Sequence, residues 1–258
     1  MILIHGWRLS GRSWELQVEN LLDLGYRVVT YDRRGFGKSD VSSTGYDYDV
    51  LASDLNDLIT ELDLSNVILA GFSMGGGEVV RYLTNYGDSN IDKIALISSI
   101  VPIVKQTSDN PNGVPQEKLE EILKSVKKER VTFLEDFLKD FYNVGLLSNP
   151  VSDKQLHYDW TIAAGASPLA TVKCAESWAS VDFRAEADKI TVPTLIVHGG
   201  DDKIVPMETS GKQASQLIVN SNFVIMSDAP HGLNVTHAEE LNNILSSFLG
   251  RANSEAGF

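Results

Sequence analysis

A chain of 258 residues that is 43% hydrophobic and 22% charged can bury a large core, which excludes disorder as its main state. Its formal net charge of -13 disfavours nucleic acid as a partner, because binding to phosphate backbones requires clustered Lys and Arg. One cysteine excludes an internal disulfide, and the histidines show no zinc-ligand spacing, so we expect no metal and no cofactor. The chain has neither an apolar run of membrane-spanning length nor a basic leader, so we expect a cytoplasmic protein without a membrane partner.

Six short apolar segments have the length and composition of buried parallel strands, and each is followed by Gly, Asp, Ser or His. They span residues 2–4, 27–31, 67–70, 94–97, 194–197 and 223–226. Between them lie stretches with helical periodicity, such as residues 51–62, which keep one apolar stripe. The alternation predicts an α/β fold with a mostly parallel sheet.

The alternation of strand and helix stops after residue 97 and resumes near residue 194. The intervening patterns are helical, so we predict an α/β core of residues 1–102 and 186–258 with a helical cap of residues 103–185. The first predicted strand already begins at Ile2. We therefore expect that a leading hairpin is missing and that strand 27–31 lies at the edge of the sheet. Near the other end, Thr236 and Glu239 predict a capping box that starts the last helix.

The motif Gly-Phe-Ser-Met-Gly occurs once, at residues 71–75, between a predicted strand and a helical run. This context is typical of a nucleophile elbow, whose two glycines leave room for a strained turn that lifts the serine hydroxyl out of the sheet. The start of the following helix directs free N–H groups at the same position. We predict that Ser73 is a nucleophile.

A serine hydroxyl needs a general base, and the base needs an acid that fixes its tautomer. In elbow proteins the chain order is Ser, Asp, His. Asp202 and His231 follow the last two predicted strands in that order, at the carboxyl ends where open α/β sheets place their sites. We predict Asp202 to orient His231, with Asp32 and Asp228 as alternative acids.

The loop after the first predicted strand would face the elbow. Its Trp7 and the elbow residue Met74 therefore offer backbone N–H groups as oxyanion-hole donors. His5 in this loop and His198 at the end of a later strand precede glycines, and we expect both to be structural residues that hydrogen-bond loop backbone.

At these residues the sequence resembles the cofactor-free haloperoxidase and aryl esterase branch of the α/β hydrolases. The matching phrases run nearly end to end, at residues 5–7, 31–39, 45–49, 71–77, 140–143, 181–184, 193–199, 204–206 and 229–232. The resemblance puts the family's triad on Ser73, Asp202 and His231. It also implies that Phe141 and Ile204 line the acyl pocket.

The resemblance implies a serine hydrolase that cleaves small carboxylic esters, aryl or short-chain, through an acyl-enzyme, and some relatives open lactones or lactams. Members also make peracids from a carboxylic acid and hydrogen peroxide. Peroxidase-labelled relatives often have proline after the oxyanion-loop Trp, where this chain has Arg8, and this departure favours plain ester hydrolysis. The alternative from another class is a ligand-binding receptor or pseudoenzyme on the same fold. The sequence leaves open whether the protein forms a homo-oligomer.

Overall fold

The core of the molecule is one parallel sheet. The computed structural model describes residues 1–145 and 148–252. Within these residues six strands lie in the order β2-β1-β3-β4-β5-β6, and every neighbouring pair is parallel. The strands are β1 (Ile2–Ile4), β2 (Val29–Thr30), β3 (Val67–Phe72), β4 (Ile91–Ile97), β5 (Thr194–Gly199) and β6 (Ser221–Met226). The predicted α/β class and all six predicted strands are confirmed.

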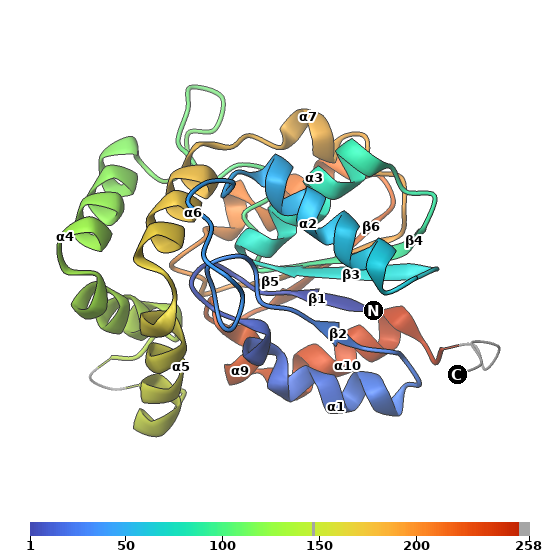
Figure 1. The fold of residues 1–258 in the computed structure, drawn as a ribbon, viewed down its shortest axis with the longest axis horizontal. Coiled ribbons are helices and arrows are strands. Elements are labelled where there is room, and N and C mark those ends of the chain that lie inside the picture. Colours follow the sequence, from blue (N-terminus) through green and yellow to red (C-terminus); the bar gives the residue numbers. More distant parts are fainter. Residues whose placement is uncertain (146–147, 253–258) are drawn as a thin grey trace.

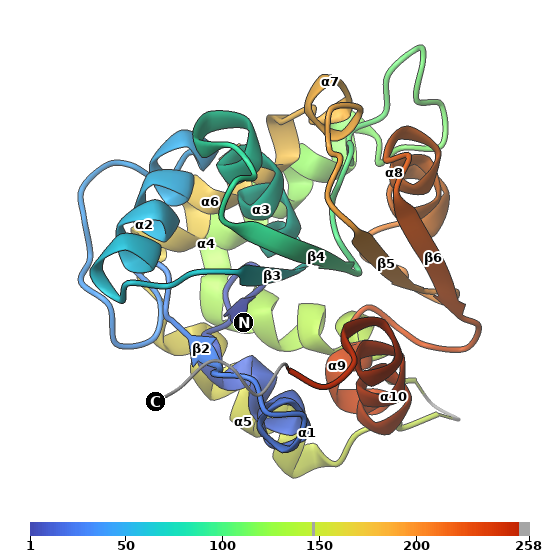
Figure 2. The same ribbon diagram turned by 90° about the vertical axis from the view of Figure 1, so that its right-hand side faces the viewer.

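Helices cover both faces of the sheet (Figure 2). One face carries α2 (Tyr48–Glu61), α3 (Met74–Tyr86), α7 (Arg184–Ala187) and α8 (Gly211–Leu217). The other face carries α1 (Glu15–Asp23), α9 (Leu233–Thr236) and α10 (Ala238–Leu249). Two 3₁₀ turns, η1 (Gly11–Trp14) and η2 (Met207–Thr209), complete the loops after β1 and β5.

Alternate residues of each strand pack against opposite helix layers. In β1, Ile2 and Ile4 belong to the apolar cluster under α2 and α3, whereas Leu3 belongs to the cluster under α1 and α10. All three side chains are fully buried. Burial on both faces explains why the inner strands β1, β3 and β5 read as continuous apolar runs rather than as alternating patterns.

Three long helices lie together beyond the carboxyl ends of the strands (Figure 1). They are α4 (Gln116–Phe141), α5 (Asp153–Gly165) and α6 (Pro168–Ser180). Helix α4 is kinked at Glu129, whose φ of -142° and ψ of 56° are not helical. The helical character predicted for this stretch is confirmed, while its division from the core at residues 103 and 185 stays a prediction. Among the described helices, none combines the length and the apolar character that a membrane crossing demands.

The predicted capping box at the start of the last helix is wrong. Thr236 is the last residue of α9, and α10 begins after His237, which makes no side-chain capping bond. The hydroxyl of Thr236 donates to the carbonyl of Gly232 at 3.3 Å. The threonine side chain is thus engaged by the preceding short helix, a contact that the capping pattern alone does not reveal.

Candidate active site

Ser73 lies on a sharp turn between β3 and α3. Its φ of 54° and ψ of -119° fall outside the regions that residues with a side chain commonly adopt. The turn needs its two glycines, because a Cβ on Gly71 would lie 2.5 Å from the carbonyl oxygen of Gly75, and one on Gly75 would lie 2.6 Å from that of Ile4. The neighbouring strand holds the turn, since the Ser73 N–H donates to the carbonyl of Ile97 at 2.9 Å. The structure therefore has the elbow geometry that the motif predicts.

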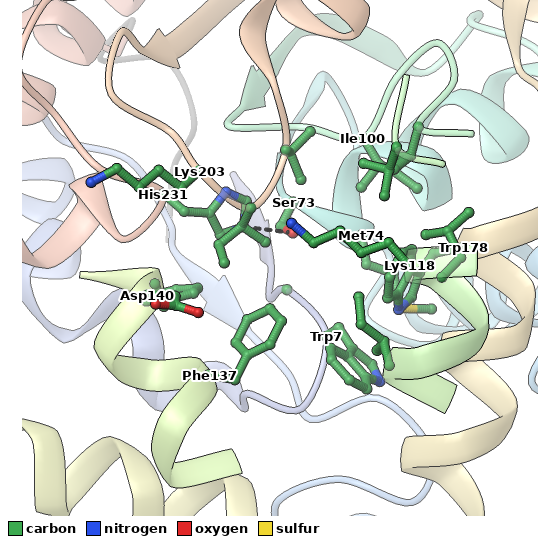
Figure 3. A pocket seen from close by; sticks show the side chains of 18 of the residues that line it. Trp7, Ser73, Met74, Ile100, Lys118, Phe137, Asp140, Trp178, Lys203 and His231 are labelled. Atoms are coloured by element: carbon green, nitrogen blue, oxygen red, sulfur yellow. Dashed lines mark hydrogen bonds between the residues drawn. The ribbon is translucent and has the colours of Figure 1, made fainter. Parts of the chain in front are cut away.

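His231 joins Ser73 to Asp202. Its Nε2 lies 3.0 Å from the Oγ of Ser73 (Figure 3). Its Nδ1 lies 2.7 Å from Oδ2 of Asp202. With the proton on Nδ1, the ring donates to the carboxylate and leaves Nε2 free to accept the serine proton. The chain brings these residues together from loops after β3, β5 and β6.

Asp202 is held in one orientation from both sides. Its Oδ1 accepts hydrogen bonds from the backbone N–H groups of Ile204 and Val205, each at 2.9 Å, so Oδ2 faces His231. The Nε2 of His198 also lies 3.3 Å from Oδ2. Burial alone would raise the pKa of the Asp202 carboxyl, but the two imidazoles, His231 foremost, outweigh burial and hold it well below its usual range. Asp202 is therefore a carboxylate at neutral pH.

Two backbone N–H groups near Ser73 are available as oxyanion donors. Met74 is the first residue of α3, so its N–H has no acceptor within the helix. The N–H of Trp7, in the loop after β1, has no hydrogen-bond partner in the part of the chain that the structure describes. The indole of Trp7 donates to the carbonyl of Thr171 at 2.9 Å, which ties this loop to α6. Trp7 and Met74 both line the cavity above Ser73.

A cavity of about 670 Å³ opens onto Ser73 and His231. Most of its wall is apolar, and α4 contributes Phe137 and Phe141 to it. Phe141 also packs on the imidazole of His231, with ring centroids 5.0 Å apart. Ile204 lines the cavity from the loop after β5. Both residues that the resemblance assigns to the acyl pocket thus lie on the wall of this cavity.

The two alternative acids lie elsewhere. Asp32 accepts the backbone N–H groups of Gly11 and Lys38, each at 2.8 Å, and so closes a loop. The side chain of Asp228 is 89% exposed and its nearest basic partner is His237. Since neither contacts His231, the geometry favours Asp202.

The two remaining strand-end histidines differ from each other. His5 is buried, and its Nε2 accepts the backbone N–H of Arg33 at 3.0 Å, which is the structural role that we expect for it. His198 contacts the carbonyl of Val205 as well as the carboxylate of Asp202. This second contact was not predicted from the sequence, although a histidine four residues before the predicted acid is a signal for it.

A serine elbow between a parallel strand and a helix, with Asp and His from later loops of the same sheet, defines a hydrolase of the α/β class. The family described as "alpha/beta hydrolase fold" matches residues 1–238, and the chain belongs to this family.

Individual relatives fall in the branch that the motifs indicate. The crystal structure of a bromoperoxidase from Bacillus anthracis has a TM-score of 0.94 and 46% identity, over 96% of this chain and 90% of that one. A non-heme chloroperoxidase from Kitasatospora aureofaciens is 35% identical over 97% of this chain and 92% of its own length. A bifunctional esterase/perhydrolase from Acinetobacter calcoaceticus is 34% identical over 95% of this chain and 89% of its own length. The resemblance to this branch is confirmed.

Proposed function

We propose that the protein is a hydrolase of small carboxylic esters, with Ser73 as nucleophile, His231 as general base and Asp202 as its orienting acid. The observation that carries the proposal is the continuous chain of hydrogen bonds from the Oγ of Ser73 through both nitrogens of His231 to Asp202. The imidazole of His231 is 1% exposed and lines a mostly apolar cavity, which suits the hydrocarbon part of an acyl or aryl group.

In this mechanism, Oγ of Ser73 attacks the ester carbonyl carbon while Nε2 of His231 takes its proton. The N–H groups of Trp7 and Met74 stabilise the oxyanion, and the protonated imidazole then delivers the proton to the departing alcohol. Water attacks the acyl-enzyme by the same route, returning the proton to Ser73 and releasing the acid. Phe141 and Ile204 would contact the acyl chain.

Plain hydrolysis is the activity that the loop after β1 favours. Arg8 has a φ of 58°, whereas proline is restricted to about -65°, so the proline loop of peroxidase-labelled relatives cannot be reproduced here without a change of backbone. The relatives' names include both esterase and perhydrolase activity, and perhydrolysis is proposed as a side activity. The receptor alternative is not favoured, because the serine, imidazole and carboxylate are aligned for proton transfer and open onto a cavity.

The test is hydrolysis of p-nitrophenyl acetate and butyrate by the wild type and by Ser73→Ala at neutral pH. We expect turnover that Ser73→Ala abolishes. Ser98→Ala is the matched control, because Ser98 is a buried serine at the end of the neighbouring strand whose hydroxyl contacts none of the triad. Loss of activity in the control, or retention of it in Ser73→Ala, would contradict the assignment of the nucleophile.

Three expectations from the sequence belong to the same proposal. We propose a cytoplasmic location and a small-molecule partner rather than nucleic acid or membrane, for which the net charge of -13 is the support. Cell fractionation followed by detection of the native chain tests the location. Light scattering on the purified protein would show whether it forms a homo-oligomer.

A further inference from the structure

One side chain in the wall of the cavity is not explained by ester hydrolysis alone. Arg8 is only 2% exposed, yet it lines the same cavity as Ser73 and His231. It follows Trp7 directly and has a left-handed φ of 58°, a conformation that disfavours a long side chain. A strained, buried arginine at this position calls for a physical reason.

The guanidinium of Arg8 is enclosed by aromatic rings. Its Cζ lies 3.9 Å from the ring centroid of Phe137, 5.3 Å from Trp7 and 5.4 Å from Phe141. The faces of aromatic rings attract a cation, but they do not accept hydrogen bonds from its N–H groups in the way an oxygen does. Nε and Nη2 are buried and have no hydrogen-bond partner among the residues that the structure describes.

No described carboxylate forms an ion pair with Arg8. Asp159, whose charge acts on Arg8, already accepts hydrogen bonds from the hydroxyl of Tyr142 at 2.6 Å and from Gln155 at 3.0 Å. Burial lowers the pKa of Arg8 to about 9, while Tyr142 and Asp159 act in the opposite direction. The side chain is therefore charged at neutral pH, and a buried charge without a close partner is unfavourable unless a ligand supplies one.

We propose that Arg8 binds a carboxylate of the substrate, so that the preferred ester is the half-ester of a dicarboxylic acid. One end of the acyl chain carries the ester carbonyl at Ser73, and the other carries the carboxylate at the guanidinium. Phe137 and Trp7 would line the methylene chain between them. The inference rests on the proposed function, and the reaction is that of any ester: the half-ester anion and water give the dicarboxylate, the alcohol and one proton.

Other cations around the cavity do not have the same character. Lys118 and Lys203 also line it, but both side chains are exposed, and Lys203 lies 3.8 Å from the carboxylate of Asp201. An exposed ammonium group is hydrated and screened, whereas the guanidinium of Arg8 is desolvated and planar, and its Nε and Nη2 have no hydrogen-bond partner among the described residues. A carboxylate is the anion that matches this arrangement.

The first test compares monomethyl succinate, adipate and suberate with the methyl alkanoates of the same carbon number, by titrating the acid released. For the best chain length, we expect Arg8→Gln to lower the ratio of kcat/KM for half-ester over neutral ester by roughly 10- to 100-fold, as expected for a lost charge-assisted hydrogen bond. Arg8→Lys should retain part of the ratio. Lys118→Gln removes an exposed cation from the same cavity and should change the ratio by less than about threefold. A ratio in Arg8→Gln within threefold of the wild type overturns the proposal.

The second test is independent of turnover and of the folding of Arg8→Gln. Calorimetry on the full-length Ser73→Ala protein compares monomethyl adipate with methyl hexanoate, which share an acyl chain length and differ by the free carboxylate. Monomethyl adipate binding at least tenfold more tightly supports the proposal, and equal binding of the two esters, or binding of neither, overturns it. If the wild type hydrolyses no ester, ester hydrolysis fails as the function while this comparison still decides whether the cavity binds a carboxylate at the far end of the chain.

Discussion

Replacing Asp202 by asparagine tests whether this residue sets the tautomer of the catalytic imidazole. The amide oxygen of the asparagine would keep the Oδ1 position, because the N–H groups of Ile204 and Val205 both point there. Turning the amide the other way would leave both backbone N–H groups facing an NH₂ group. Each unsatisfied N–H would then destabilise the fold by about 1–3 kcal/mol. The NH₂ group must therefore take the Oδ2 position, 2.7 Å from Nδ1 of His231.

An NH₂ group at that position donates a hydrogen bond, so Nδ1 must accept it and the imidazole proton moves to Nε2. The ring then donates to Ser73 and cannot take the serine proton. The same replacement in a Ser-His-Asp triad lowers kcat by about 10,000-fold. We expect a loss of about 1,000- to 10,000-fold here, or ~4–5.5 kcal/mol of transition-state stabilisation at 1.36 kcal/mol per tenfold.

The assay is kcat for p-nitrophenyl butyrate, with melting temperature measured on the same samples. Asp201→Asn is the matched control, since Asp201 is the neighbouring residue, exposed to solvent, and bonded to Asn143 rather than to an imidazole. We expect it to keep its rate within about threefold. A folded Asp202→Asn protein with a rate within tenfold of the wild type would refute the assignment of Asp202 as the orienting acid.

Three further changes test other parts of the site. Gly75→Ala should lower the free energy of unfolding by about 1–3 kcal/mol, because the added Cβ would lie 2.6 Å from the carbonyl oxygen of Ile4 and 3.0 Å from that of His5; an unchanged urea midpoint would contradict the tight packing of the elbow. The depressed pKa of Asp202 means that its carboxylate stabilises the fold above the ordinary aspartate pKa of about 3.9 and that this stability is lost as pH falls through the lower, folded pKa. Urea unfolding of the wild type between about pH 5 and pH 2 should therefore show a steeper loss of unfolding free energy than Asp202→Asn does, and parallel curves would argue against the shift. Ile204→Ala should move the preference among p-nitrophenyl esters toward longer acyl chains, and an unchanged chain-length profile would remove Ile204 from the acyl pocket.

Local sequence was sufficient where the chemistry is local. The six strands were predictable because each is a short apolar run, and the inner strands β1, β3 and β5 are buried along their whole length. The elbow was predictable because its glycines are dictated by close backbone contacts at the turn. The ends of the strands were not all predicted correctly. Gly71 and Phe72 extend β3 beyond the predicted end, since the sheet pairs them with β4 up to Ile97. Pairing of this kind is a property of the neighbouring strand and not of the run itself.

The surroundings of Arg8 could not be predicted in the same way. The rings that enclose it come mainly from Phe137 and Phe141 in α4, about half the chain away from Arg8, and no periodicity links them. From the sequence, Arg8 was notable only because peroxidase-labelled relatives often have proline at this position. The burial of Arg8 and its lack of hydrogen-bond partners depend on tertiary packing, in which rings from α4 enclose the guanidinium.

Chemistry and selectivity are divided between different parts of this fold. In the proposed mechanism, the loops after β1, β3, β5 and β6 supply the nucleophile, base, acid and oxyanion donors, and these loops all follow strands of one sheet. Helix α4 supplies Phe137 and Phe141, and the carbonyl of Phe141 accepts the N–H of Gly232 at 2.9 Å, next to His231. A substitution on the cavity face of α4 that keeps this bond should change which acyl group fits while the proton transfers stay in place. Substitution at Phe141 itself removes a ring that packs on His231, so we expect it to affect both selectivity and rate.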